Sequence, residues 1–334
     1  MGAEPVVTNA EQTGTAQLAR ARGRAYVLLG ELVARGLTSS TRGPARASAL
    51  LSAALDSYAE GDALDADHHD VFLAGVFPLE DVYLHADGLV GTEAAEPLQR
   101  LLEQSGVRED SSELPGHLSS VLRGLALLSA EQGHASLAGL GRSREHLVTL
   151  LDAHLLRWFA PFAAAVRRMG RAFPSALIDQ LEGLLVEHRE GLGGAMAEFA
   201  LAGNALDSDD EGVGVRDLAR WFATPARFGA FVSHADIDAW AKAGAWPRGY
   251  GSRVDRIEAL LHTAAENDEF ARLMEVIAAW VSVVAEAMAA GPLAETGATR
   301  EAVRPWKDRL GASGGIVENL RRRAGQGGGA VGVN

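Results

Sequence analysis

Apolar side chains recur every three or four residues along most of the chain, which is the period of an amphipathic helix. The clearest case is the segment 143–171, where His154, Trp158 and Phe162 share one face with a row of leucines. Further apolar residues widen this face until the middle of the segment is apolar nearly all round. The pattern therefore predicts a central helix with other helices packed on several sides.

Pro161 lies inside this segment and predicts a kink, because proline removes a backbone donor and clashes with the preceding turn. Two interpretations stay open. The kinked helix shapes a groove, or it is a core helix that tolerates one proline.

The same period predicts further helices, and three of them have suitable caps: Ser233, Ser252, and Asn267 or Asp268. No run of alternating β-branched residues is convincing, so the predicted fold class is all-α, a helical bundle. The expected helices are 15–35, 44–60, 68–76, 92–105, 115–129, 172–190, 215–223, 233–243, 252–266 and 269–290, with short helices at 301–309 and 316–323.

The acidic, glycine-ended segment 208–212 is the best linker candidate. It separates a predicted helical domain of residues 15–205 from a helical extension of residues 213–292, which contains four of the six tryptophans. Residues 293–334 are predicted to form a polar tail, partly disordered because its end is rich in glycine.

Composition excludes several classes of site and partner. The chain has no cysteine, which rules out disulfides, thiolate metal sites and a cysteine nucleophile. The net charge of −13 argues against nucleic acid as the main partner. The first residues lack the pattern of a signal peptide, and the longest apolar run, 276–285, is about half a membrane span. We therefore expect a cytoplasmic protein with no membrane span.

No common catalytic motif is present: the chain lacks a phosphate-binding P-loop, a G-x-S-x-G and an H-E-x-x-H sequence. The cluster of His68, His69 and Asp70 with Asp65 and Asp67 is either a surface metal site or a solvated helix start. The second interpretation is favoured. The sequence therefore predicts no enzyme, no metal and no cofactor.

Acidic residues are concentrated between Asp56 and Glu113. This window contains 15 acidic residues and only two basic ones. This window also contains the apolar loop 77–83. An acidic surface beside an apolar pocket suits a peptide with arginines followed by hydrophobic residues. A solvated acidic face is the other interpretation of the same charges.

Three blocks of sequence carry a family resemblance: Phe-Pro-Leu-Glu-Asp-Val-Tyr at 77–83, Glu-Leu-Pro-Gly-His-Leu at 113–118, and His-Leu-Leu-Arg-Trp-Phe-Ala-Pro-Phe at 154–162. In this order and spacing, residues 15–205 resemble the TorD/DmsD/NarJ family of redox enzyme maturation chaperones. The resemblance implies an all-helical protein that binds the twin-arginine leader and the apo form of a molybdopterin oxidoreductase catalytic subunit. It further implies a role in cofactor insertion and assembly before export.

The resemblance also assigns a surface. Glu80 would pair with an arginine of the client, while Phe77 and Tyr83 would hold its apolar part. For Tyr83, Trp158 and Phe162 a role in packing alone stays open. The implied leader-binding residues are Phe77, Pro78, Glu80, Tyr83, Glu113 and His117, supported from below by His154, Trp158, Pro161 and Phe162.

Two alternatives from other classes are kept. In the first, the chain is a structural or adaptor subunit retained in a larger redox enzyme complex, and its tryptophan-rich extension is the interface. In the second, it is a nucleotide-dependent enzyme, an alternative that the missing phosphate loop disfavours.

Overall fold

The described part of the chain is helical, as the sequence predicts. Within it there is no strand, and Leu79 and His117 form an isolated antiparallel bridge. The all-α prediction is confirmed. The computed structural model describes residues 9–59, 61–89, 91, 96–107, 114, 116–132, 137–203, 206, 213–295 and 297–326.

The elements fall into an N-terminal and a C-terminal set. The first set is α1 (Asn9–Arg35), α2 (Ser39–Arg46), α3 (Ala49–Asp56), α4 (Gly61–His68), the π-helix η1 (His69–Leu73), α5 (Glu80–Leu84), α6 (Glu96–Gln104), α7 (Leu118–Gln132), α8 (Leu137–Thr149), the π-helix η3 (Leu150–Leu155), α9 (Leu156–Arg168) and α10 (Ala172–Leu192). The second set is α11 (Val215–Ala223), α12 (Pro225–Phe228), α13 (His234–Gly244), α14 (Arg253–Glu266), α15 (Phe270–Ala290), α16 (Pro292–Glu295) and α17 (Gly297–Gly325).

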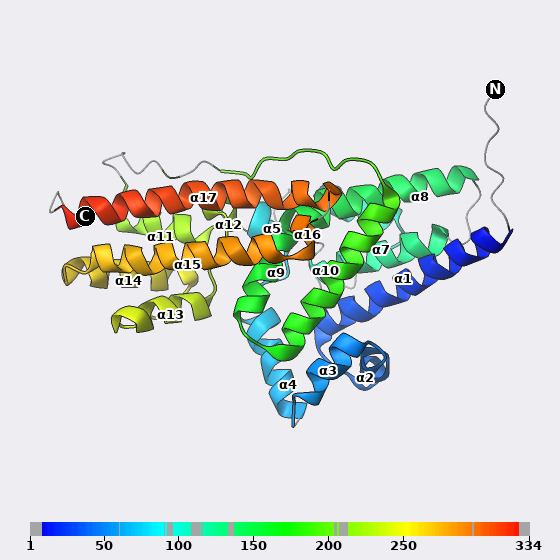
Figure 1. Cartoon of the computed structure of the whole chain (residues 1–334), viewed down its shortest axis with the longest axis horizontal. Coiled ribbons are helices and arrows are strands. Elements are labelled where there is room, and N and C mark those ends of the chain that lie inside the picture. Colours follow the sequence, from blue (N-terminus) through cyan, green and yellow to red (C-terminus); the bar gives the residue numbers. More distant parts are fainter. Residues whose placement is uncertain are drawn as a thin grey trace.

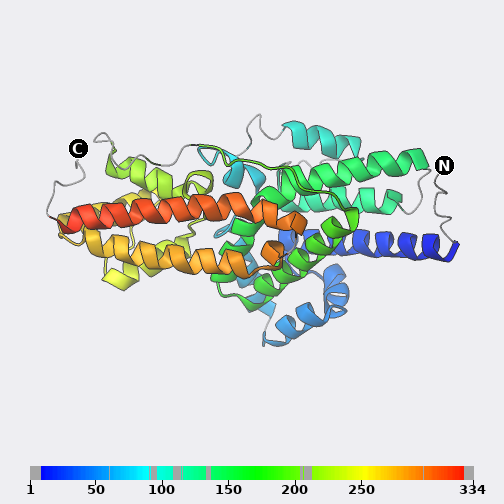
Figure 2. The ribbon, with the colours of Figure 1, turned by 45° about the horizontal axis from the view of Figure 1, so that its top comes forward.

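The molecule is elongated, with α1, α7 and α8 toward one end and α11, α13 and α14 toward the other (Figure 1). Helix α1 packs along α7, and α15 packs along α17, as the second view also shows (Figure 2). Helices α9 and α10 lie between the two ends. A single hydrophobic cluster of buried residues includes side chains from both sets. The predicted linker 208–212 lies outside the described residues, so the division into domains stays a prediction.

The central helix occupies the predicted position. Helix α9 contacts α5, α10, α15 and α17, and Trp158, Phe159 and Phe162 are fully buried. Its irregular turn is the π-helix η3, which comes before Pro161, whereas α9 itself continues through the proline. A π-helical turn is a second known cause of local distortion in a helix, and the sequence pattern does not reveal it.

The helix predicted at 44–60 is wrong, because the structure breaks it at Ala47 and Ser48. Thr38 caps α2 and Ser48 caps α3, each side chain accepting a bond from a backbone N–H three residues further on. The caps predicted at Ser233 and Ser252 are confirmed, since each forms a capping box with the aspartate three residues later. The cap predicted at Asn267 or Asp268 is wrong, because α15 begins after Glu269, which makes no side-chain cap hydrogen bond.

The interpretation of 293–334 as a polar tail is also wrong for the described residues. Helix α17 is continuous over Gly297–Gly325, where two short helices were expected. Its buried face includes Trp306, Leu310 and Val317, together with small or polar residues that hid the period in the sequence. Gly314, near its middle, allows close packing, because a Cβ atom there would lie 3.3 Å from the side chain of Val281 on α15.

Two helices are long and apolar enough to cross a membrane by length and composition. In Gly141–Arg168, 67% of the apolar window is buried, which is what a core helix of a soluble fold shows. In Phe270–Ala290 the buried share is 33%, and this helix packs along α17. Two such helices are weak evidence for a membrane span.

Gly229 is expected to be essential for docking α17. Its φ is +94°, and a Cβ atom there would lie 2.5 Å from the backbone nitrogen of Leu310. Gly229→Ala should lower the free energy of unfolding by about 1–3 kcal/mol, measured by urea denaturation. Gly311→Ala is the matched control, because a Cβ atom there meets nothing within 4 Å. An equal effect of both substitutions would contradict this account.

Candidate functional site

The three sequence blocks that carry the resemblance meet in space. The backbone N–H of Glu80 donates to the carbonyl of Gly116 at 3.0 Å, and that of Leu118 donates to the carbonyl of Pro78 at 2.8 Å. The third block joins through His154, whose Nδ1 lies 3.1 Å from Oε1 of Glu80. Segments up to 74 residues apart in sequence are thus connected around one glutamate.

Glu80 and His154 form a largely buried hydrogen-bonded pair. Their side chains are 13% and 12% exposed. Burial raises the pKa of Glu80 above its ordinary value, and the hydrogen bond and charge of His154 oppose this effect. His154 itself lies in η3, where its carbonyl accepts a bond from the indole of Trp158. The carboxylate is therefore held in one orientation at the edge of the core.

Tyr83 lies beneath this pair and does not reach the surface. Its ring stacks on Trp158 at a centroid distance of 5.3 Å and meets Phe162 edge-on at 6.2 Å. All three side chains are fully buried. In this conformation they support the surface from within, as the packing interpretation predicts. The direct contact of Tyr83 with a client stays a prediction that requires the core to open.

The remaining predicted residues differ in accessibility. Phe77 and His117 are half-buried, and Pro78 is buried. His117 serves to cap α7, since its Nδ1 accepts from the backbone N–H of Ser119 at 3.2 Å. Glu113 lies outside the described residues. Glu80, Phe77 and His117 are thus the predicted binding residues that a partner can reach.

Several acids of the window 56–113 are neutralised by arginines from elsewhere in the chain. Arg171 pairs with Asp67 at 3.1 Å and with Asp70 at 3.4 Å, and Arg227 pairs with Asp87 at 2.6 Å. These contacts weaken the acidic field that the sequence suggested. They also account for the histidine and aspartate cluster near residue 68, and among the described residues no group of three could hold a metal ion.

A groove of about 850 Å³ opens beside the end of α5, at the contact between the two sets of helices. Its walls combine apolar side chains with two arginine–aspartate pairs, Arg227–Asp87 and Arg220–Asp217. The lining residues are Asp87, Leu89, Gly203, Leu206, Asp217, Arg220, Trp221, Thr224, Arg227 and Val254. The groove offers contact area and hydrogen bonding, and its lining contains no arrangement of nucleophile and base.

The sequence did not identify two residues that border the site. Phe231 contacts both Phe77 and Tyr83, and Arg253 lies over the ring of Phe231. Both come from the C-terminal set of helices. The aromatic composition of that region draws attention to Phe231 but does not say which ring it contacts, and no pattern in the sequence singles out Arg253.

Comparison with known proteins relates the part of the chain that contains the three blocks to a family. The sequence model of the family described as "Nitrate reductase delta subunit" matches residues 42–164, which contain all three blocks. No curated protein and no solved structure matches the chain. The family consists of maturation factors that act on a molybdoenzyme, and its members are not catalysts. The match confirms the resemblance over residues 42–164, which are similar to the NarJ/TorD-type family of redox enzyme maturation chaperones.

Proposed function

We propose that the chain is a cytoplasmic chaperone for the catalytic subunit of a molybdopterin oxidoreductase. It binds the apo form of that subunit and its twin-arginine leader, which keeps the client from export until the cofactor is inserted. The observation that carries this proposal is the convergence of the three family blocks around Glu80. Binding energy alone does the work, and no covalent bond changes.

Glu80 is the residue best suited to recognise an arginine of the leader. A carboxylate that pairs with a guanidinium forms charge-assisted hydrogen bonds, which are stronger than neutral ones. Because His154 already fixes the carboxylate, little side-chain freedom is lost when the client binds. The nearby groove then supplies contact area for the folded body of the client.

The adaptor alternative has less support in the structure than in the sequence. It relied on the tryptophans of the extension as an exposed interface. Trp221, Trp240 and Trp246 are instead buried in the chain's own core, at 7% exposure or less. A stable complex would need another surface, and no described feature favours one.

Glu80→Gln is expected to weaken binding of the client about tenfold, because a hydrogen bond to a charged group contributes about 1.5–3 kcal/mol. The probe is a molybdopterin oxidoreductase catalytic subunit prepared without cofactor and with its arginine-pair leader. Affinity is measured by isothermal titration calorimetry. Glu103→Gln, which alters an exposed glutamate on α6, is the control and should bind as the unmodified chain does.

The stability of Glu80→Gln shows whether weaker client binding comes from the lost carboxylate or from misfolding. The raised pKa of Glu80 means that the folded chain holds a proton more tightly than the unfolded chain does. Ionisation of the Glu80 carboxyl therefore lowers the free energy of unfolding as the pH rises above the ordinary carboxyl range. Glutamine cannot ionise, so the substitution removes this loss. Glu80→Gln should be as stable as the unmodified chain, or more so, at neutral pH. Unchanged affinity in a stable variant would count against the proposed surface.

A further inference from the structure

Phe231 covers the aromatic face that the sequence assigns to the client. It lies between α12 and α13, and its ring centroid is 5.5 Å from that of Tyr83. It also meets Phe77 edge-on, with centroids 6.5 Å apart. The chain thus fills the apolar part of its own candidate surface with a residue 148 positions further along (231 − 83).

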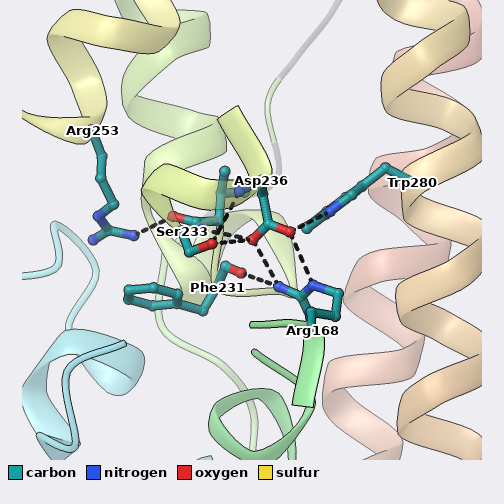
Figure 3. Close-up of polar contacts among 7 residues, drawn as sticks. Arg168, Phe231, Ser233, Asp236, Arg253 and Trp280 are labelled. Atoms are coloured by element: carbon teal, nitrogen blue, oxygen red, sulfur yellow. Dashed lines mark hydrogen bonds and ion pairs between the residues drawn. The ribbon is translucent and has the colours of Figure 1, made fainter. Parts of the chain in front are cut away.

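The backbone around Phe231 is anchored by hydrogen bonds, while its ring is held by packing and by the guanidinium of Arg253 above it. Arg168 donates to the carbonyl of Phe231 at 2.7 Å, and Arg253 donates to the carbonyl of Val232 at 3.0 Å. Figure 3 shows the ring of Phe231 directed away from the pair formed by Arg168 and Asp236. A change of side-chain rotamer would therefore uncover Tyr83 without breaking these backbone bonds.

Three polar groups next to Phe231 are incompletely satisfied. The hydroxyl of Tyr83 and Nη1 of Arg168 are buried and have no hydrogen-bond partner within the described residues. Arg253 has no carboxylate partner among the described residues. Burial lowers the pKa of its guanidinium to about 10. Buried polar groups in finished cores are nearly always paired. The two unpartnered atoms and the guanidinium without a carboxylate are therefore donors, next to one ring, that a bound segment can use.

We propose that Phe231 occupies, in cis, the position of a large apolar side chain of the client. Phe77 and Tyr83 receive that side chain when the ring of Phe231 rotates away. Main-chain carbonyls of the bound segment then accept hydrogen bonds from the hydroxyl of Tyr83 and from Arg253. This inference rests on the proposed function, because it assigns part of the same client surface.

The spacing of the two subsites defines the segment that fits. Glu80 and Tyr83 are three residues apart on α5, so their side chains lie on one face, about 5–6 Å apart at Cβ. An extended peptide covers this distance in two residues of about 3.3 Å each. The expected partner is an extended segment with an arginine followed two positions later by a large apolar residue.

Removal of the Phe231 ring should strengthen binding of such a segment. The probe is a synthetic peptide in which a pair of arginines is followed by phenylalanine and leucine, and its affinity for the full chain is measured by fluorescence anisotropy. Phe231→Ala is expected to bind it about tenfold more tightly than the unmodified chain, because the competing side chain is gone.

Phe228→Ala is the matched control. Phe228 is equally buried and lies three residues away, but its ring packs on Trp221, Phe222 and Trp280. It therefore opens a cavity of the same size without uncovering Tyr83, and the peptide affinity should not change. If Phe231→Ala fails to fold, Phe231→Leu, which keeps an apolar side chain, should still bind the peptide more tightly than the unmodified chain.

The outcomes separate the two proposals. Equal or weaker peptide binding by the folded Phe231 variant, with client binding that still depends on Glu80, overturns the cis-occupant inference alone. An equal gain in Phe228→Ala overturns it as well, since a general loosening of the core would explain both. If neither the unmodified chain nor the variant binds peptide or client, both proposals fail.

Discussion

Arg168→Ala is expected to lower the free energy of unfolding by about 3–5 kcal/mol, because it leaves a buried carboxylate without its cation. Arg168 reaches from the end of α9 to Asp236 on α13, with two contacts of 3.1 Å, and the side chains are 12% and 8% exposed. Trp280 of α15 donates to the same carboxylate at 2.8 Å (Figure 3). One arginine therefore links three helices, and its loss should loosen the attachment of the extension.

Urea denaturation measures this change, and an exposed pair provides the control. Arg220 and Asp217 are both more than half exposed, so Arg220→Ala should alter the unfolding free energy by no more than about 0.5–1 kcal/mol. A loss of similar size in both variants would show that burial of the Arg168 pair is not what stabilises the fold.

The effect of Arg168→Ala should shrink on acidification. Burial acts to raise the pKa of Asp236, but Arg168 and the hydrogen bonds from Ser233 and Trp280 lower it below its ordinary value. The ionised carboxylate therefore contributes stability above the ordinary aspartate pKa, and this contribution is lost as the pH falls through the folded value. Without Arg168 the pKa rises and the carboxylate is neutralised sooner. Unfolding curves at decreasing pH should converge, and a constant gap would contradict this assignment.

Local pattern was enough to predict the helices that have a continuous apolar stripe. The segment 215–223 matches α11 at both ends, and the central helix has the predicted place in the core. The family resemblance predicted which three segments carry the site, and the structure brings their described residues together around Glu80. These successes share a cause: the information lies within a few turns of helix or in a motif.

Contacts between distant segments could not be predicted from the sequence. Nothing near Phe231 indicates that its ring faces Tyr83 or that it closes the predicted apolar pocket. Tyr83 was expected either to bind the client or to pack, and both roles need the same aromatic residue. Only the arrangement of α5 against the segment before α13 reveals that Tyr83 is enclosed and that Glu80 remains at the edge.

Trp306→Ala is expected to lower the free energy of unfolding by about 3–5 kcal/mol, the range for truncating a buried tryptophan. The side chain is fully buried where α17 crosses α9, although the sequence placed it in a polar tail. Its indole donates to the carbonyl of Arg157 at 2.5 Å. That carbonyl lies four residues before Pro161, and proline has no N–H to complete the helical bond.

Trp306 thus replaces the donor that Pro161 removes, and a double-mutant cycle can isolate this contribution. Trp306→Phe keeps most of the ring but leaves the Arg157 carbonyl buried without a donor, which should cost about 1–3 kcal/mol. In a Pro161→Ala background, the new backbone N–H can bond to the same carbonyl. The cost of Trp306→Phe should then fall by about 1 kcal/mol or more. If both backgrounds lose the same free energy in urea denaturation, Trp306 stabilises α9 by packing alone.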